Sequence, residues 1–173
     1  KRQIDNAPSL WLEPGKYIIA DAGYLLTKVV ATKKSYKNYI GTDAGMETLM
    51  RPALYGAKHR IYKVGDHGNN EITVDFTGQI CENTDRIATD RSFPHLKEND
   101  LIAIMDAGAY GYSMSHNFNT RPRSAEILLD KSSDSVRPLL RVPAIGLIVT
   151  LSFWCWTNIS GDAPITLNSS KLI

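Results

Sequence analysis

The chain has 173 residues, with 20 basic and 18 acidic side chains and a formal net charge of +2. This length allows one domain, or one domain and a fragment of another, but excludes a complete two-domain enzyme. The basic residues are scattered rather than clustered, so we expect no nucleic-acid partner. Cys81 and Cys155 lie far apart, which favours free thiols in a reducing, cytoplasmic compartment over a disulfide framework.

The beginning of the chain resembles an internal piece of a longer protein. It opens with Lys1 rather than Met and has no signal pattern. Glu13-Pro14-Gly15 follows a short apolar run and predicts a tight turn with exposed backbone N–H groups.

Pro52 disfavours helix in the residue before it, so a short helix should end near Arg51. In order we expect a helix over 17–22, strands over 24–30 and 36–42, and a helix over 45–50.

The middle of the chain predicts a mainly β fold. Residues 58–64 and 71–76 are expected to form a hairpin, because the segment between them is rich in Gly and Asn. Ile72, Val74 and Phe76 alternate with polar residues and therefore share one face of their strand. Two further strands are expected, a central one over 101–105 and another over 124–129.

Cys81 and Glu82 follow the strand at 71–76 and are expected at the rim of the sheet, partly exposed. Reactive groups are useful at such a position. A lone cysteine in a β-rich chain is more often a small apolar residue than a catalytic one, so the spacing alone leaves both interpretations open.

The turn from Asp106 to Tyr112 carries Tyr110 between two glycines. This pattern permits close approach of the backbone to a ligand, although a simple bend between strands is the interpretation that the residues alone favour. The four histidines are dispersed, and no metal-ligand spacing is present, so we expect no metal.

The end of the chain is apolar over residues 142–156. This run is shorter than the roughly 20 residues of a membrane-spanning helix, so we expect an edge strand and an adhesive surface, and keep a membrane anchor as the second interpretation. We therefore divide the chain into residues 1–15, the end of a truncated β/α barrel; 16–140, a β domain; and 141–173, an atypical apolar tail.

Five stretches between about residues 10 and 140 together resemble the C-terminal part of diaminopimelate decarboxylases, which are pyridoxal-phosphate enzymes. Each stretch is weak alone, and their order and spacing carry the resemblance. They are Glu13-Pro14-Gly15-Lys16; Asp43-Ala44-Gly45-Met46 with Arg51-Pro52-Ala53-Leu54-Tyr55; Gly78-Gln79-Ile80-Cys81-Glu82; Asp106 to Met114; and Asn117-Phe118-Asn119 with Arg121-Pro122-Arg123.

The resemblance implies a Greek-key β-barrel or sandwich-like domain of the alanine racemase/decarboxylase type, with short helices. In that family this domain is joined to a β/α barrel that carries the cofactor lysine, and the enzyme is a homodimer. The implied reaction converts meso-2,6-diaminopimelate to L-lysine and CO2, with pyridoxal 5'-phosphate as cofactor. Since the barrel is missing, we expect no decarboxylation from this chain alone.

The resemblance also implies roles for single residues. Arg51 and Tyr55 would hold a substrate carboxylate, Glu82 the distal ammonium, and Tyr110 both cofactor and substrate. Cys81 would donate the proton to the carbon that loses CO2, which suits a thiol with a pKa near about 8.5. In the family, Cys81 and Glu82 would complete the site of the partner subunit.

The first of the five stretches would contact the cofactor. Glu13, Pro14 and Gly15 would face the cofactor phosphate through their backbone. Lys16 would contact cofactor and substrate, and it replaces the arginine usual in the family. A point charge in place of a two-pronged group can shift substrate affinity or choice.

Two other hypotheses remain open. The first is a related decarboxylase acting on ornithine, arginine or carboxynorspermidine, for which Glu82 is the discriminating position. The second, of a different class, is a non-catalytic dimerisation module that lacks the barrel.

Overall fold

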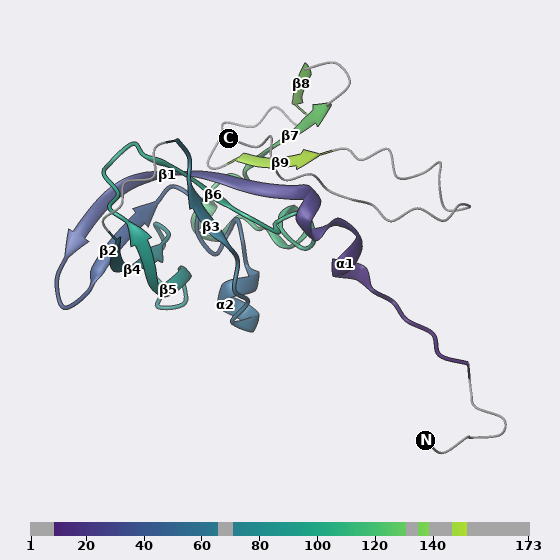
Figure 1. The fold of residues 1–173 in the computed structure, drawn as a ribbon, viewed down its shortest axis with the longest axis horizontal. Helices are drawn as coiled ribbons and strands as arrows, with labels where there is room; N and C mark the ends of the chain where they lie inside the picture. Colours follow the sequence, from purple (N-terminus) through teal and green to yellow (C-terminus); the bar gives the residue numbers. More distant parts are fainter. Residues whose placement is uncertain (1–8, 66–70, 131–134, 139–146, 152–173) are drawn as a thin grey trace.

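The strands form one curved, barrel-like mixed sheet, which confirms the mainly β fold class (Figure 1). The computed structural model describes residues 9–65, 71–130, 135–138 and 147–151. Its elements are α1 (Gly15–Ile19), η1 (Ala20–Ala22), β1 (Gly23–Lys34), β2 (Asn38–Thr42), α2 (Arg51–Tyr55), β3 (Ile61–Lys63), β4 (Glu71–Thr77), β5 (Arg86–Pro94), β6 (Leu101–Ile104), η2 (Tyr112–Met114), η3 (Phe118–Thr120), β7 (Ala125–Asp130), β8 (Ser135–Pro138) and β9 (Leu147–Leu151).

Strand β1 runs through both parts of this sheet. Its first half pairs with β6 on one side and β9 on the other, and Leu25 lies opposite a residue of each. After an irregularity between Val29 and Ala31, its second half pairs with β2. The strand order is β5-β4-β2-β1-β9-β7-β8, and β6 joins β1 to β3. Bulges of this kind bend a strand, which allows β1 to serve both parts.

The core lies between these strands and is apolar. Phe76 of β4 and Phe93 of β5 pack edge to face, with ring centroids 5.1 Å apart. The alternation along β4 is confirmed for Val74 and Phe76, which are buried, while Ile72 is half-buried. Asp75 is buried as well, and its carboxylate is compensated by the backbone N–H of Asp90 at 2.7 Å and by Nζ of Lys37 at 3.4 Å.

The expected hairpin of 58–64 with 71–76 is wrong. Strand β3 pairs with β6, and β4 lies between β2 and β5. The helix expected over 45–50 is also wrong, because this segment is a turn in which the Gly45 carbonyl accepts the N–H groups of Thr48 and Leu49. The helix, α2, begins at Arg51 instead. Pro52 fits there because the first turn of a helix needs no N–H donor.

The apolar run at 142–156 does not give an edge strand. Strand β9 lies inside the sheet, antiparallel to β1 and parallel to β7. Residues 142–146 and 152–156 of that run lie outside the described residues, as does Cys155. No helix in the described part of the chain is long and apolar enough to cross a membrane.

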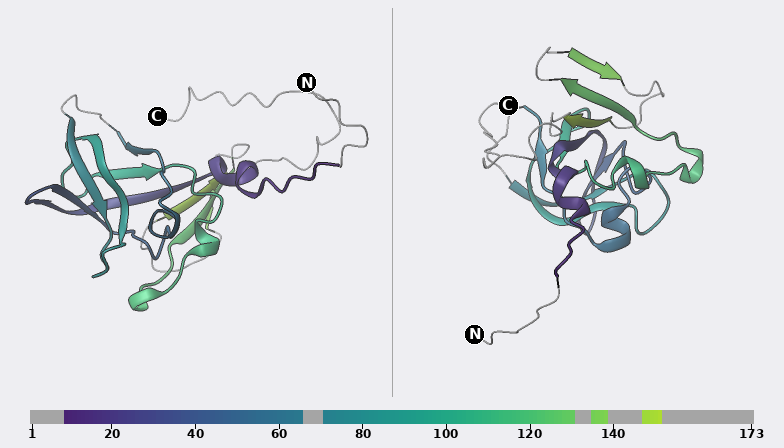
Figure 2. Two further views of the ribbon diagram at one scale, coloured as in Figure 1. Left: turned by 90° about the horizontal axis from the view of Figure 1, so that it is seen from below. Right: turned by 90° about the vertical axis from the view of Figure 1, so that its right-hand side faces the viewer.

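The segment before β1 projects from the body of the sheet (Figure 2). Helix α1 and η1 confirm the brief helix expected over 17–22. The side chains that precede and form this helix are highly exposed, Trp11 at 89% and Tyr17 at 88%. These exposed apolar groups offer a large contact surface to another body of protein.

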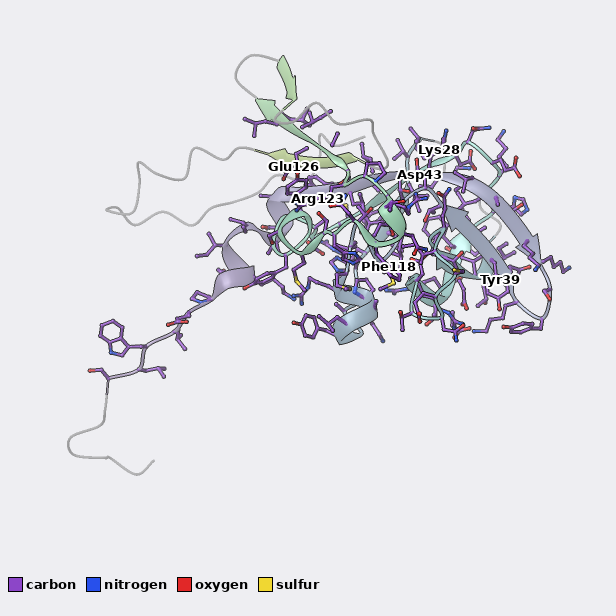
Figure 3. All side chains as sticks on the ribbon, turned by 180° about the vertical axis from the view of Figure 1, so that it is seen from behind. Lys28, Tyr39, Asp43, Phe118, Arg123 and Glu126 are labelled. Carbon is purple, nitrogen blue, oxygen red and sulfur yellow. The ribbon has the colours of Figure 1, made fainter. Side chains whose placement is uncertain are left out.

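The segment after β6 is anchored to the turn at 43–50 by a buried ion pair. Glu47 is 1% exposed, and its Oε1 lies 3.0 Å from Nε of Arg121. The same guanidinium donates to the carbonyl of Asp43 at 3.1 Å. Asp43 in turn accepts the N–H of Lys28 at 2.8 Å, and Figure 3 shows these two residues side by side. The turn is therefore fixed between β1 and the 115–123 segment.

Removing one partner of this pair should destabilise the chain strongly. Arg121→Met leaves the Glu47 carboxylate buried without its cation, so we expect the free energy of unfolding in urea to fall by about 3–5 kcal/mol. Arg60→Met is the control, because the Arg60–Asp106 pair is largely exposed and should cost about 1 kcal/mol or less. Equal losses for the two variants would contradict a structural role for the Glu47–Arg121 pair.

Candidate functional site

Tyr110 and Gly15 meet although 95 positions separate them in the sequence. A Cβ atom on Gly15 would lie 2.8 Å from the hydroxyl oxygen of Tyr110, so the phenol occupies the space that a side chain at position 15 would need. Tyr110 is 43% exposed and has a φ of 60°, in the left-handed region that residues other than glycine seldom adopt. Such conformations concentrate at functional sites, where neighbouring contacts hold them.

The turn that carries Tyr110 is held by contacts at its beginning. Arg60 forms a two-pronged ion pair with Asp106, with Nη2 to Oδ1 at 2.9 Å and Nε to Oδ2 at 3.2 Å. The N–H of Ala107 donates to the carbonyl of Gly23 at 2.8 Å, and that of Gly108 to the carbonyl of Ala20 at 2.9 Å. These contacts fix the turn on the junction of η1 and β1.

Arg51 joins the same cluster from the start of α2. Its guanidinium carbon lies 5.5 Å from the ring centroid of Tyr55 and 5.4 Å from that of Tyr110. Tyr55 lies one turn along α2, which ends at Gly56 in a left-handed cap with a φ of 61°. The arrangement leaves guanidinium and phenol donors together at a partly exposed surface, which suits binding of a carboxylate.

His59 is buried next to the start of the Tyr110 turn. Its Nδ1 is 2.8 Å from the carbonyl oxygen of Met105, and the residue is 6% exposed. Burial lowers the pKa of His59, the bond to Met105 and the charge of Asp106 oppose this, and Arg51 and Lys16 add to the lowering. The ring is therefore neutral near pH 7 and serves as a structural hydrogen-bond donor rather than a cation.

The turn at Glu13-Pro14-Gly15 has fewer free N–H groups than the sequence predicted. The Gly15 N–H donates to the Glu13 carbonyl at 2.8 Å, and the Tyr17 N–H to the Pro14 carbonyl at 3.2 Å. The reason is that the chain enters α1 directly at this turn. Lys16 is exposed on α1.

Cys81 and Glu82 lie on a separate loop, residues 78–85, after β4. Cys81 is a free, exposed thiol, as expected for a position at the rim of the sheet. Glu82 is exposed, and its Oε1 accepts the N–H of Thr84 at 3.4 Å. Among the described residues, no hydrogen bond, ion pair or aromatic contact joins these two side chains to the cluster of Arg51, Tyr55 and Tyr110.

Sequence analysis missed three residues that hold the site. His59 and Arg60 support the Tyr110 turn, and Asp85 binds the loop of Cys81. Each acts through backbone groups or a distant ion pair, which leaves no periodic signal in the sequence. Within the described residues there is no group of three or more His, Cys, Asp or Glu side chains that could hold a metal ion.

Comparison with known proteins places this geometry in a family. The model of the pyridoxal-dependent decarboxylase C-terminal sheet domain matches residues 16–108. A curated relative, diaminopimelate decarboxylase of Methanothermobacter thermautotrophicus, is 48% identical over 124 residues, which cover 70% of this chain and 29% of the relative.

Solved structures agree. Diaminopimelate decarboxylase from M. jannaschii, in complex with L-lysine, has a TM-score of 0.69 at 39% identity, covering 76% of this chain and 30% of that one. The Helicobacter pylori enzyme, also complexed with L-lysine, has a TM-score of 0.67 at 39% identity, covering 73% and 30%. The chain thus spans less than a third of the length of these relatives.

The family model covers more than half of the 173 residues, including β1 to β6, α2 and the first residues, Asp106 to Gly108, of the turn that carries Tyr110. The curved sheet agrees with this match. This chain therefore belongs to the pyridoxal-dependent decarboxylases and carries their C-terminal sheet domain.

Proposed function

We propose that this chain is the sheet domain of a diaminopimelate decarboxylase that releases CO2 from meso-2,6-diaminopimelate and forms L-lysine. The observation that carries the proposal is the cluster of Arg51, Tyr55 and Tyr110, with Tyr110 against Gly15. Identity of 48% to a relative named for this activity supports the choice of substrate. The remaining part of the enzyme would be the barrel domain that the relatives' extra length accommodates.

The described residues fit pyridoxal 5'-phosphate and an amino-acid substrate. Gly15 leaves space for the phenol of Tyr110, and a side chain there would displace it. The Tyr110 hydroxyl, the Arg51 guanidinium and the exposed ammonium of Lys16 supply donors for anionic groups. When bound, the cofactor supplies the electron sink for cleavage of the bond to the carboxyl group. We assign Gly15, Lys16 and Tyr110 to its side of the site, together with the backbone N–H of Glu13, while Pro14, which has no N–H, would shape the turn that carries them.

The substrate must be held at the end that does not react. A guanidinium with a neighbouring phenol provides directional donors to the distal carboxylate, and we assign this role to Arg51 and Tyr55. Glu82 would accept from the distal ammonium. The lysine product has lost the reacting carboxyl group but keeps the distal ammonium and carboxylate groups. The same contacts would therefore hold the product.

Cys81 would supply the proton that replaces CO2 on the substrate carbon. Cys81 is exposed, and a thiol is a stronger acid than a hydroxyl, so it can donate a proton to a carbanion. Because Cys81 and Glu82 make no described contact with the Arg51 cluster, we assign them to the site of a partner subunit in a homodimer. A free thiol also fits a reducing, cytoplasmic compartment.

Cys81→Ser in the complete enzyme tests the proton donor. The hydroxyl is a far weaker acid, so kcat should fall by about 10²–10⁴ while binding of the cofactor persists. Asn83→Ala, at another exposed position of the same loop, is the control and should keep kcat. Full activity of the Cys81→Ser enzyme would contradict this role. If neither Cys81 nor Arg51 affects kcat, a non-catalytic dimerisation module would be favoured.

Glu82→Ala separates diaminopimelate from the other decarboxylase substrates. Loss of the acceptor for the distal ammonium should lower kcat/KM for diaminopimelate by about 10–100-fold, a cost of roughly 1.4–3 kcal/mol. Glu98→Ala, another exposed acid, is the control. The measurement is kcat/KM for diaminopimelate, ornithine and arginine. An unchanged preference among the three would count against diaminopimelate as the substrate.

A further inference from the structure

A single buried carboxylate joins the loop of Cys81 to the loop that leads to Arg51. Asp85 is 3% exposed; its Oδ2 accepts the N–H of Ile80 at 2.7 Å, and its Oδ1 accepts the N–H of Met46 at 2.7 Å. We call residues 78–85 the Cys81 loop and residues 43–50 the Arg51 loop. The Asp85 side chain therefore binds one backbone N–H from each loop. Ile80 directly precedes Cys81, and Met46 lies five residues before Arg51.

Two glycines make this contact close. A Cβ on Gly78 would lie 2.6 Å from the Cα of Gly45 and would overlap the Asp85 carboxylate. A Cβ on Gly45 would lie 2.9 Å from the Cα of Gly78 and would also overlap that carboxylate. The two backbones and the carboxylate thus pack without room for a methyl group, which leaves the loops little freedom to move apart.

The contact also has backbone support. The N–H of Gly78 donates to the carbonyl of Asp85 at 3.1 Å, which closes the Cys81 loop on itself. The hydroxyl of Thr84 lies 3.7 Å from the sulfur of Met46. Charge-assisted bonds to backbone N–H groups are about twice as strong as neutral ones, so Asp85 dominates this junction.

We propose that Asp85 is a positioning residue, which fixes Cys81 and Glu82 relative to the Arg51 loop without touching substrate or cofactor. Its hold on Ile80 restricts the backbone immediately before the thiol. The functional half of this inference rests on the proposed role of Cys81, whereas the structural half concerns the two backbone amides alone.

The structural half is tested by hydrogen exchange on the full chain with Asp85→Asn. The new amide group offers one acceptor and one donor, so one of the two N–H groups loses its partner. We expect the amide of Met46 or Ile80, or both, to exchange at least about tenfold faster. The matched control is Asp75→Asn, since Asp75 is 1% exposed, accepts the backbone N–H of Asp90 and forms an ion pair with Lys37, neither of which belongs to the two loops. Unchanged exchange at both amides, or the same acceleration there in the control, would overturn the inference.

If Asp85→Asn does not fold, the unaltered chain still decides this half. Amides bound by a buried carboxylate should exchange at least about a hundredfold more slowly than in an unfolded chain. Such protection at Met46 and Ile80 supports the junction. Exchange near the rate of an unfolded chain would overturn it.

The functional half is tested by kinetics of the complete enzyme. Asp85→Asn should lower kcat by at least about tenfold when Cys81 is present and by less than about threefold in the Cys81→Ser background, because it acts through the thiol. A general loss of stability would lower kcat equally in both backgrounds, and that result would overturn the positioning role. If Cys81→Ser alone leaves kcat intact, the proposed function fails, while the exchange result still stands on its own.

Discussion

The parallel pairing of β2 and β4 is the constraint on which the candidate site depends. The register places Gly41 opposite Thr77, so the two strands end together and the loops that follow leave the same edge of the sheet. The Arg51 loop and the Cys81 loop are therefore neighbours, although residues 51–77 lie between them in the sequence. Asp85 then needs only one short side chain to bind both.

Buried polar contacts surround these loops on both sides. Asp85 binds the Arg51 loop to the Cys81 loop, and the Glu47–Arg121 pair binds it to the segment that follows the Tyr110 turn. Buried ionic groups contribute less to net stability than apolar packing does, but loss of one partner is costly, so such contacts favour one arrangement over others. Under the proposed function, the Arg51 loop serves one active site of the dimer and the Cys81 loop serves the other.

The sequence predicted local features well and long-range ones poorly. Alternation at 71–76 and the apolar run at 101–105 identified β4 and β6, because both signals depend only on neighbouring residues. The expected hairpin does not form because β4 pairs in parallel with β2, which is distant in sequence, while the adjacent strand β3 pairs with β6. Strand β5 was missed because its middle is polar and exposed, and Asp85 because a buried acid leaves no pattern. The candidate site residues came from the resemblance, and their grouping around Tyr110 came from the structure.

Subunit complementation tests most directly whether this domain serves two active sites. The complete enzyme would be prepared as Cys81→Ser and Arg51→Ala homodimers, each inactive, then mixed under conditions that exchange subunits. If Cys81 acts in the partner's site, each heterodimer contains one unaltered site, and the mixture should regain about a quarter of the unaltered activity. Activity that stays at the sum of the two inactive parents would contradict the account.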